Sequence, residues 1–249
     1  MVHVYKASVV MKFRDDRFMF VEEKVVFEEG LGYGGVKLLE VCPLSSRKND
    51  GIRLFMTVEA SNREEAEQKL FEFTERLALA LCCRNNIGVR VEIEDIIPAI
   101  ESVKIDDRVY VVMITDTISI KDENEIGLKL SKDLFKEAVE VIQGLPEEVL
   151  RFLFWYSRAL LEKDPVNCFI MLWTALEVWK TYLYPADGHR KGMKKVFDSY
   201  GCKGFKNIYE LRNKVFHAGA RMDVEKFLQE VMNCVYQIVK QLRGQYYNK

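Results

Sequence analysis

Three residues near the end of the chain carry side chains suited to acid–base chemistry on a phosphate. They lie in the stretch "ELRNKVFHAGA", where Arg212 and Asn213 are adjacent and His217 follows four residues after Asn213. An unperturbed imidazole has a pKa of about 6.5, so it gains and loses a proton near neutral pH. The forked donors of arginine hold a phosphate in a geometry that lysine does not copy. We therefore treat Arg212, Asn213 and His217 as the candidate catalytic residues.

Helix geometry decides how these three side chains can meet. On an ideal helix, Asn213 and His217 are about 40° apart around the axis and share a face, whereas Arg212 and His217 are about 140° apart. The long guanidinium arm, fraying near Gly219, or the same helix of a second protomer would bring Arg212 and His217 together. We expect a site completed across a homodimer interface, because a symmetric contact places the same helix of both protomers side by side.

Glu177 is the supporting candidate, since it is a carboxylate within the largely apolar stretch "VNCFIMLWTALEVWKTYLY". A buried charge without a partner is costly, so we expect Glu177 to orient Arg212 or Asn213 or to form a plain structural ion pair. A purely structural interpretation also explains Arg212, Glu177 and His217. In that alternative Arg212 pairs with Glu177 or Glu210, and His217 caps the C-terminus of its helix, where a cation is favoured.

The part of the chain that carries these residues, 126–249, has a helical pattern almost throughout. Ser131 and Gly144 mark the limits of one helix, Pro146 begins another, and Asp164 with Pro165 begins the central one. A basic segment punctuated by glycines then leads to "FKNIYELRNKVFHAG" and to a last helix, "DVEKFLQEVMNCVYQIVKQLR". Four or five helices with short links predict an up-and-down bundle.

Residues 1–125 predict an α+β domain, an antiparallel sheet with one long helix. Its expected strands are "VYKASVVMKF", "RFMFVEEKVVFEE", "RLFMTVEA", "VRVEIEDI" and "RVYVVMITDTISI". Its helix is "SNREEAEQKLFEFTERLALALCCRNN", in which Ser61 and Glu64 have capping-box spacing. This domain has no Gly-rich phosphate loop, no clustered His or Cys and no nucleophile elbow, so its role, whether binding a peptide, a nucleotide or a regulatory ligand, stays open.

The charge balance and the cysteine content indicate which partners and which cellular compartment to expect. Residues 1–126 carry 17 Lys+Arg and 24 Asp+Glu, and residues 127–249 carry 20 and 14, which indicates different partners for the two halves. The six cysteines form no CxxC pair, so we expect reduced thiols, with no disulfide and no structural metal. No apolar run reaches the roughly 18 uncharged residues of a spanning helix, so we expect a soluble, cytoplasmic protein without membrane contact.

The string "RNKVFH", late in a small helical domain, resembles the signature of HEPN domains, and "FIMLWTALEVWKTYLY" is similar to the apolar helix with an "LE" pair in the Apea-like branch. The resemblance covers about residues 131–243. It implies an all-α HEPN-like bundle that acts as a dimeric, metal-independent endoribonuclease without a cofactor, in toxin–antitoxin, antiviral or RNA-processing systems. The family also contains members that have lost catalysis and serve as binding modules.

Metal-free RNA cleavage by attack of the 2′-hydroxyl fits these residue types. His217 would transfer a proton, Arg212 would hold the phosphate, and Asn213 would orient the imidazole or cap a carbonyl. The candidate RNA-contacting residues are Arg190, Lys191, Lys194, Lys195 and Lys214. A solvated surface explains these basic residues equally well. RNA and a possible antitoxin or regulatory partner are thus the expected partners.

Overall fold

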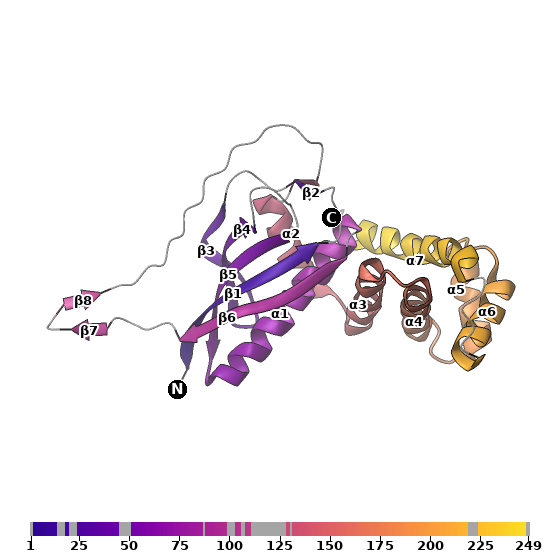
Figure 1. Cartoon of the computed structure of the whole chain (residues 1–249), viewed down its shortest axis with the longest axis horizontal. Helices are drawn as coiled ribbons and strands as arrows, with labels where there is room; N and C mark the ends of the chain where they lie inside the picture. Colours follow the sequence, from indigo (N-terminus) through magenta and orange to yellow (C-terminus); the bar gives the residue numbers. More distant parts are fainter. Residues whose placement is uncertain are drawn as a thin grey trace. The chain divides into compact units, whose positions relative to one another are not determined.

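The computed structural model describes residues 2–13, 18–19, 24–44, 51–86, 88–98, 103–105, 108–110, 128–129, 131–218 and 224–247. The chain splits into two compact units (Figure 1). The first comprises Met1–Leu77 and Arg90–Val139, and the second comprises Ala78–Val89 and Glu140–Lys249. An antiparallel sheet precedes a helical region, as the sequence predicts.

The first unit is built on a five-stranded sheet in the order β3-β4-β5-β1-β6. The strands are β1 (His3–Phe13), β3 (Val25–Tyr33), β4 (Val36–Pro43), β5 (Gly51–Ala60) and β6 (Val89–Pro98). Along β1, alternate side chains from Tyr5 to Phe13 are buried, because successive residues of a strand face opposite sides. The other face carries exposed ion pairs, Lys12 with Glu92 and Arg53 with Glu94.

Strand β4 is absent from the strands that the sequence predicts. Its pairing with β5 shifts register between Leu38 and Glu40, and such an irregularity interrupts the alternation by which a strand is recognised. Four short strands complete the described β structure: β2 (Phe18–Met19), β7 (Val103–Ile105), β8 (Arg108–Tyr110) and β9 (Leu128–Lys129). The strand expected over "RVYVVMITDTISI" lies outside the described residues except for β8.

Helix α1 (Arg63–Asn85) begins one residue later than its expected capping box implies. Asn62, rather than Ser61, accepts the backbone N–H three residues on, that of Glu65, at 2.9 Å. The Glu65 carboxylate in turn accepts the backbone N–H of Ser61 at 2.8 Å. Asn62 is therefore the N-cap, and Glu65 bonds back to Ser61, the residue before the cap, so the expected box between Ser61 and Glu64 is not formed. Asn and Ser are comparable N-caps, and sequence spacing alone does not separate them.

The second unit is helical and contains α3 (Glu147–Leu161), α4 (Pro165–Leu183), α5 (His189–Ser199), α6 (Phe205–Ala218) and α7 (Val224–Tyr247). It also contains the last part of α2 (Lys132–Gly144), whose residues up to Val139 belong to the first unit. The expected caps are confirmed. Ser131 Oγ accepts the Leu134 N–H at 3.2 Å, and Asp164 accepts the N–H groups of Val166 and Asn167. Helix α5 occupies the basic segment for which no helix was predicted.

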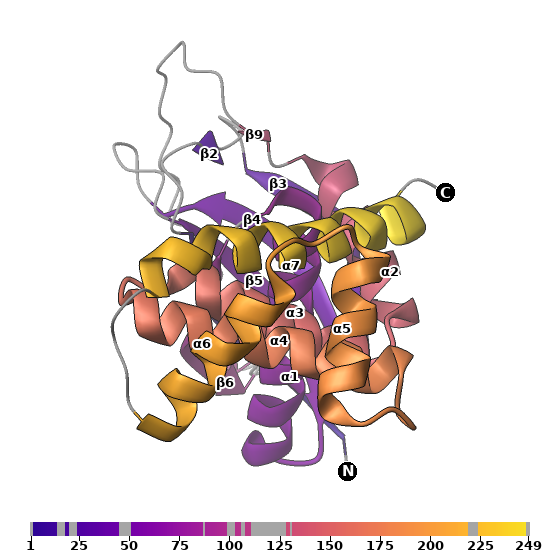
Figure 2. The same cartoon turned by 90° about the vertical axis from the view of Figure 1, so that its right-hand side faces the viewer.

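Helix α4 is the centre of this unit. It contacts α3, α5, α6 and α7 (Figure 2), and Phe169, Leu172, Trp173 and Leu176 are fully buried. The end of α1 belongs to the same core through Leu79, Cys82 and Cys83. The change in hydrophobic period along the sequence places the domain boundary between residues 125 and 126. In the structure, the boundaries between the two units instead fall within α1, near residue 89 and within α2. In the described part of the chain, no helix has both the length and the hydropathy needed to cross a membrane.

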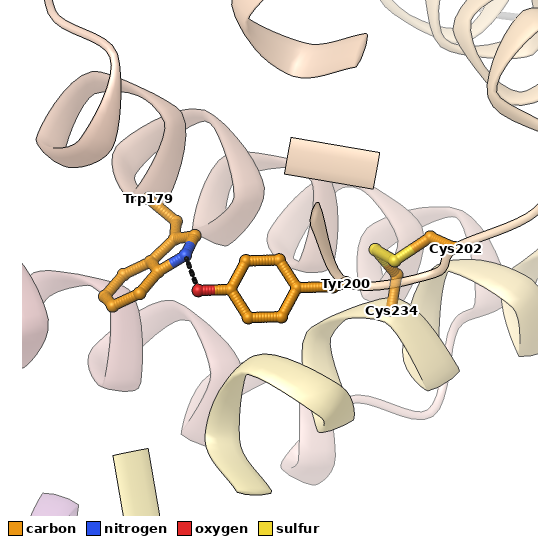
Figure 3. The surroundings of a disulfide bond; sticks show 4 residues. All are labelled: Trp179, Tyr200, Cys202 and Cys234. Carbon is orange, nitrogen blue, oxygen red and sulfur yellow. Dashed lines mark hydrogen bonds between the residues drawn. A yellow bond between two sulfur atoms is a disulfide. The ribbon is translucent and has the colours of Figure 1, made fainter. Parts of the chain in front are cut away.

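The expectation of six reduced cysteines is wrong. Cys202, between α5 and α6, forms a disulfide with Cys234 of α7, with Cα atoms 5.3 Å apart (Figure 3). Beside it, Trp179 Nε1 donates a hydrogen bond to the Tyr200 hydroxyl at 3.0 Å. The pairing links residues 32 apart in sequence and has no spacing signature, so only the fold reveals it. Disulfides persist mainly in oxidising compartments, so this bond argues against the expected cytoplasmic location.

Thiol counting tests this pairing. Cys42, Cys82, Cys83 and Cys168 are thiols outside this disulfide, so protein denatured without reductant should titrate as four thiols per chain. Reduction before denaturation should raise the count to six, the number of cysteines in the sequence. Six thiols in freshly prepared, unreduced protein would contradict the Cys202–Cys234 bond.

Candidate functional site

Helix α6 presents two distinct faces. Ile208, Leu211 and Val215, spaced at three and four residues, are buried in the helical core. Tyr209, Arg212, Asn213 and Phe216 form the adjoining stripe and are half-buried or exposed. Packing of the apolar stripe therefore fixes the orientation of the stripe that carries Arg212 and Asn213.

Glu177, in the middle of α4, is the acceptor around which the site is organised. Its Oε1 accepts hydrogen bonds from Arg212 Nη2 at 3.0 Å, His189 Nε2 at 2.9 Å and Trp173 Nε1 at 2.6 Å. The Glu177 side chain is 29% exposed and that of Arg212 is 19% exposed. One partly buried carboxylate oxygen thus joins side chains from α4, α5 and α6.

The Arg212 guanidinium is held from several sides. Nη1 donates to Asn213 Oδ1 at 3.3 Å, and the guanidinium carbon lies 4.6 Å from the centre of the Phe216 ring. Its Nε is buried and has no hydrogen-bond partner among the described residues. The contact expected between Glu177 and Arg212 is present. His217 belongs to α6 by its backbone, but its side chain lies outside the described residues.

His189, the first residue of α5, lies between two elements of this site. Its Nδ1 is 3.0 Å from the Tyr209 hydroxyl, while its Nε2 contacts Glu177. A carboxylate only accepts, so Nε2 carries a proton. Sequence reasoning counted His189 only within the basic segment and did not select Tyr209. No spacing rule connects residues 177, 189 and 209, which come from three helices.

The expected basic residues do not form one cluster. Lys191 and Lys195 both bind the Asp187 carboxylate, at 3.2 and 2.6 Å, and the hydrogen bond from Lys195 is the main cause that lowers the pKa of Asp187. Arg190 lies over the Tyr209 ring, with its guanidinium carbon 5.7 Å from the ring centre. Lys194 and Lys214 are exposed. Arg190 thus contacts Tyr209, whose hydroxyl is 3.0 Å from His189 Nδ1.

No protein-family model matches this sequence, and no curated protein or solved structure is significantly similar to it. Function therefore has to be inferred from the side chains of this site. Within the described ranges, no group of three or more His, Cys, Asp or Glu residues is placed to hold a metal ion. The site offers a held guanidinium, an imidazole and a phenol around one carboxylate.

Replacing the Glu177 carboxylate tests how much it contributes to the stability of the fold. We expect Glu177→Gln to lower the free energy of unfolding by about 1–3 kcal/mol, because it leaves the partly buried Arg212 without its counter-charge. All three tryptophans lie in the helical unit, so their fluorescence during urea unfolding reports on that unit.

The matched control is Glu147→Gln on α3. Glu147 pairs with Arg151 at 3.6 Å, and these side chains are 56% and 68% exposed. Such a surface pair contributes less than about 0.5 kcal/mol. Equal losses in the two variants would show that Glu177 is no more important to stability than a surface carboxylate.

Proposed function

We propose that this chain is a metal-independent endoribonuclease of the HEPN type, cleaving RNA by attack of a 2′-hydroxyl on the adjacent phosphate. The observation that carries the proposal is the Arg212–Glu177 ion pair of 3.0 Å, which holds the guanidinium on the face of α6 that also bears Asn213. Metal-free cleavage needs a fixed cation for the phosphorane charge and groups that move protons. The motif supplies the cation as Arg212 and a proton-transfer group as His217.

Each residue has a distinct role in this mechanism. Arg212 binds the scissile phosphate through the donor positions that Glu177 and Asn213 leave open, and its restrained side chain loses little conformational entropy on binding. His217 accepts the proton of the attacking 2′-hydroxyl. Asn213 fixes the guanidinium through its 3.3 Å bond. The products are a 2′,3′-cyclic phosphate and a 5′-hydroxyl.

The proposal includes two protomers. Arg212 and His217 are five residues apart on α6, about 140° around an ideal axis, so His217 of a second copy completes the site around Arg212. The N-terminal α+β unit then recognises a signal, the RNA or a protein partner such as an antitoxin. A toxin–antitoxin or antiviral role follows from the HEPN resemblance.

Cleavage assays test the activity directly. Purified protein in EDTA should cut mixed single-stranded and structured RNA and leave 2′,3′-cyclic phosphate ends. Arg212→Ala and His217→Ala should each lower the rate by about 10²–10⁴-fold, the usual contribution of a proton-transfer or charge-stabilising group. His3→Ala is the control for loss of an imidazole outside the site, and Lys206→Ala, exposed on α6, is the control for loss of a cation.

A second candidate function is a non-catalytic HEPN module that binds RNA or a ligand. It is favoured by the neutralising contact between Glu177 and Arg212, which lowers the net charge offered to a phosphate. The same assay separates the two functions. Wild-type protein that binds RNA at moderate salt but leaves it intact would support the binding module and contradict the nuclease.

Subunit mixing tests the composite site. An equimolar mixture of inactive Arg212→Ala and His217→Ala protomers, allowed to exchange, should regain about a quarter of wild-type activity, since half the dimers contain one intact pair. Mixtures that stay as inactive as their components, although exchange is shown by light scattering of tagged protomers, would place Arg212 and His217 in the same chain's site.

A further inference from the structure

Beside Arg212 lies a continuous carboxylate, imidazole and phenol array. Glu177 Oε1 is 2.9 Å from His189 Nε2, and His189 Nδ1 is 3.0 Å from the Tyr209 hydroxyl. The three residues come from α4, α5 and α6, so packing of these helices creates the array. A hydroxyl within hydrogen-bond reach of an imidazole that a third group orients is the arrangement by which proteins activate a hydroxyl.

Hydrogen-bond chemistry determines which atom of this array donates at each contact. Because the Glu177 carboxylate only accepts, Nε2 of His189 carries a proton in every state that keeps the bond. In the neutral imidazole, Nδ1 is bare and the Tyr209 hydroxyl donates to it. In the protonated imidazole, Nδ1–H donates to the Tyr209 oxygen. A proton can therefore pass between Tyr209 and His189 with no movement of their heavy atoms.

The array shares its carboxylate oxygen with Arg212, since Glu177 Oε1 also accepts Arg212 Nη2 at 3.0 Å. Tyr209 precedes Arg212 by three residues and Asn213 by four, so all three lie on one face of α6. The Tyr209 phenol and the phosphate-binding guanidinium thus belong to one site in one chain. Arg190, over the Tyr209 ring, adds positive charge where negative charge develops on a leaving oxygen.

Ring packing restrains the phenol. The Tyr209 ring lies 5.9 Å from the buried Trp173 ring and 5.5 Å from that of Phe205. The hydroxyl end is less enclosed, because Tyr209 is half-buried and the His189 side chain is 39% exposed. A restrained ring with an accessible polar end suits a group that has to meet a substrate.

We propose that Tyr209, supported by His189 and Glu177, is the general acid that protonates the 5′-oxygen leaving group, an inference that rests on the proposed RNA cleavage. The bond from the 2′-oxygen to phosphorus forms and the bond from phosphorus to the 5′-oxygen breaks. The 2′-hydroxyl proton goes to His217. Tyr209 gives its proton to the 5′-oxygen and regains one from Nδ1 of protonated His189. His217 and His189 then exchange protons with water, which restores the starting state.

RNA with a bridging sulfur in place of the scissile 5′-oxygen tests this assignment, because a thiolate leaves without protonation. We expect Tyr209→Phe to lower kcat/KM on ordinary RNA by about 10²–10³-fold and on the sulfur-bridged RNA by less than about 3-fold. His189→Gln should show the same split. Arg212→Ala should be impaired on both substrates. Tyr182→Phe, at an exposed tyrosine of α4, is the matched control and should resemble wild type on both.

Each outcome has one reading. If Tyr209→Phe loses equal activity on both substrates, with an unchanged circular dichroism spectrum, Tyr209 only supports the structure and the inference fails while RNA cleavage stands. Wild-type rates on both substrates would also overturn it. If wild-type protein cleaves neither RNA, the proposed function is contradicted and the general acid is contradicted with it.

Discussion

The need to pair the Glu177 charge is the constraint on which the helical unit depends. Glu177 lies in α4, whose other side chains form much of the core, and an unpaired charge there would be costly. Three hydrogen-bond donors, from Trp173, His189 and Arg212, surround the Glu177 Oε1 atom. Two of these donors come from α5 and α6. The free-energy cost of burying the carboxylate is therefore offset only when both helices pack against α4.

Other interactions hold these helices in that arrangement. The Cys202–Cys234 disulfide ties the connection between α5 and α6 to α7, and the Trp179–Tyr200 hydrogen bond ties the end of α5 to α4. Neither interaction involves the Glu177 carboxylate, yet both restrain the two helices that supply His189 and Arg212. The polar site is therefore supported by a covalent link and by the apolar stripe of α6, and it does not depend on its own hydrogen bonds alone.

Local signals in the sequence predicted what local interactions determine. Ser131 and Asp164 cap their helices within three residues, so the starts of α2 and α4 could be read directly. The apolar surroundings of Glu177 correctly indicated that it needs a partner. His189 and Tyr209 were missed because they meet only through the packing of separate helices, and the disulfide was missed for the same reason. Strand β4 escaped detection because its irregular register breaks the period that identifies strands.

The most direct test of this account is the ring N–H proton of His189 in the NMR spectrum of the protein. The chain has three histidines, so single replacements of His3 and His217 assign its signal. We predict a downfield, slowly exchanging Nε2–H that is present in wild type and in Glu147→Ala but lost in Glu177→Ala, which removes the acceptor oxygen. A rapidly exchanging His189 proton in wild type, or one unaffected by Glu177→Ala, would contradict the claim that one carboxylate organises this site.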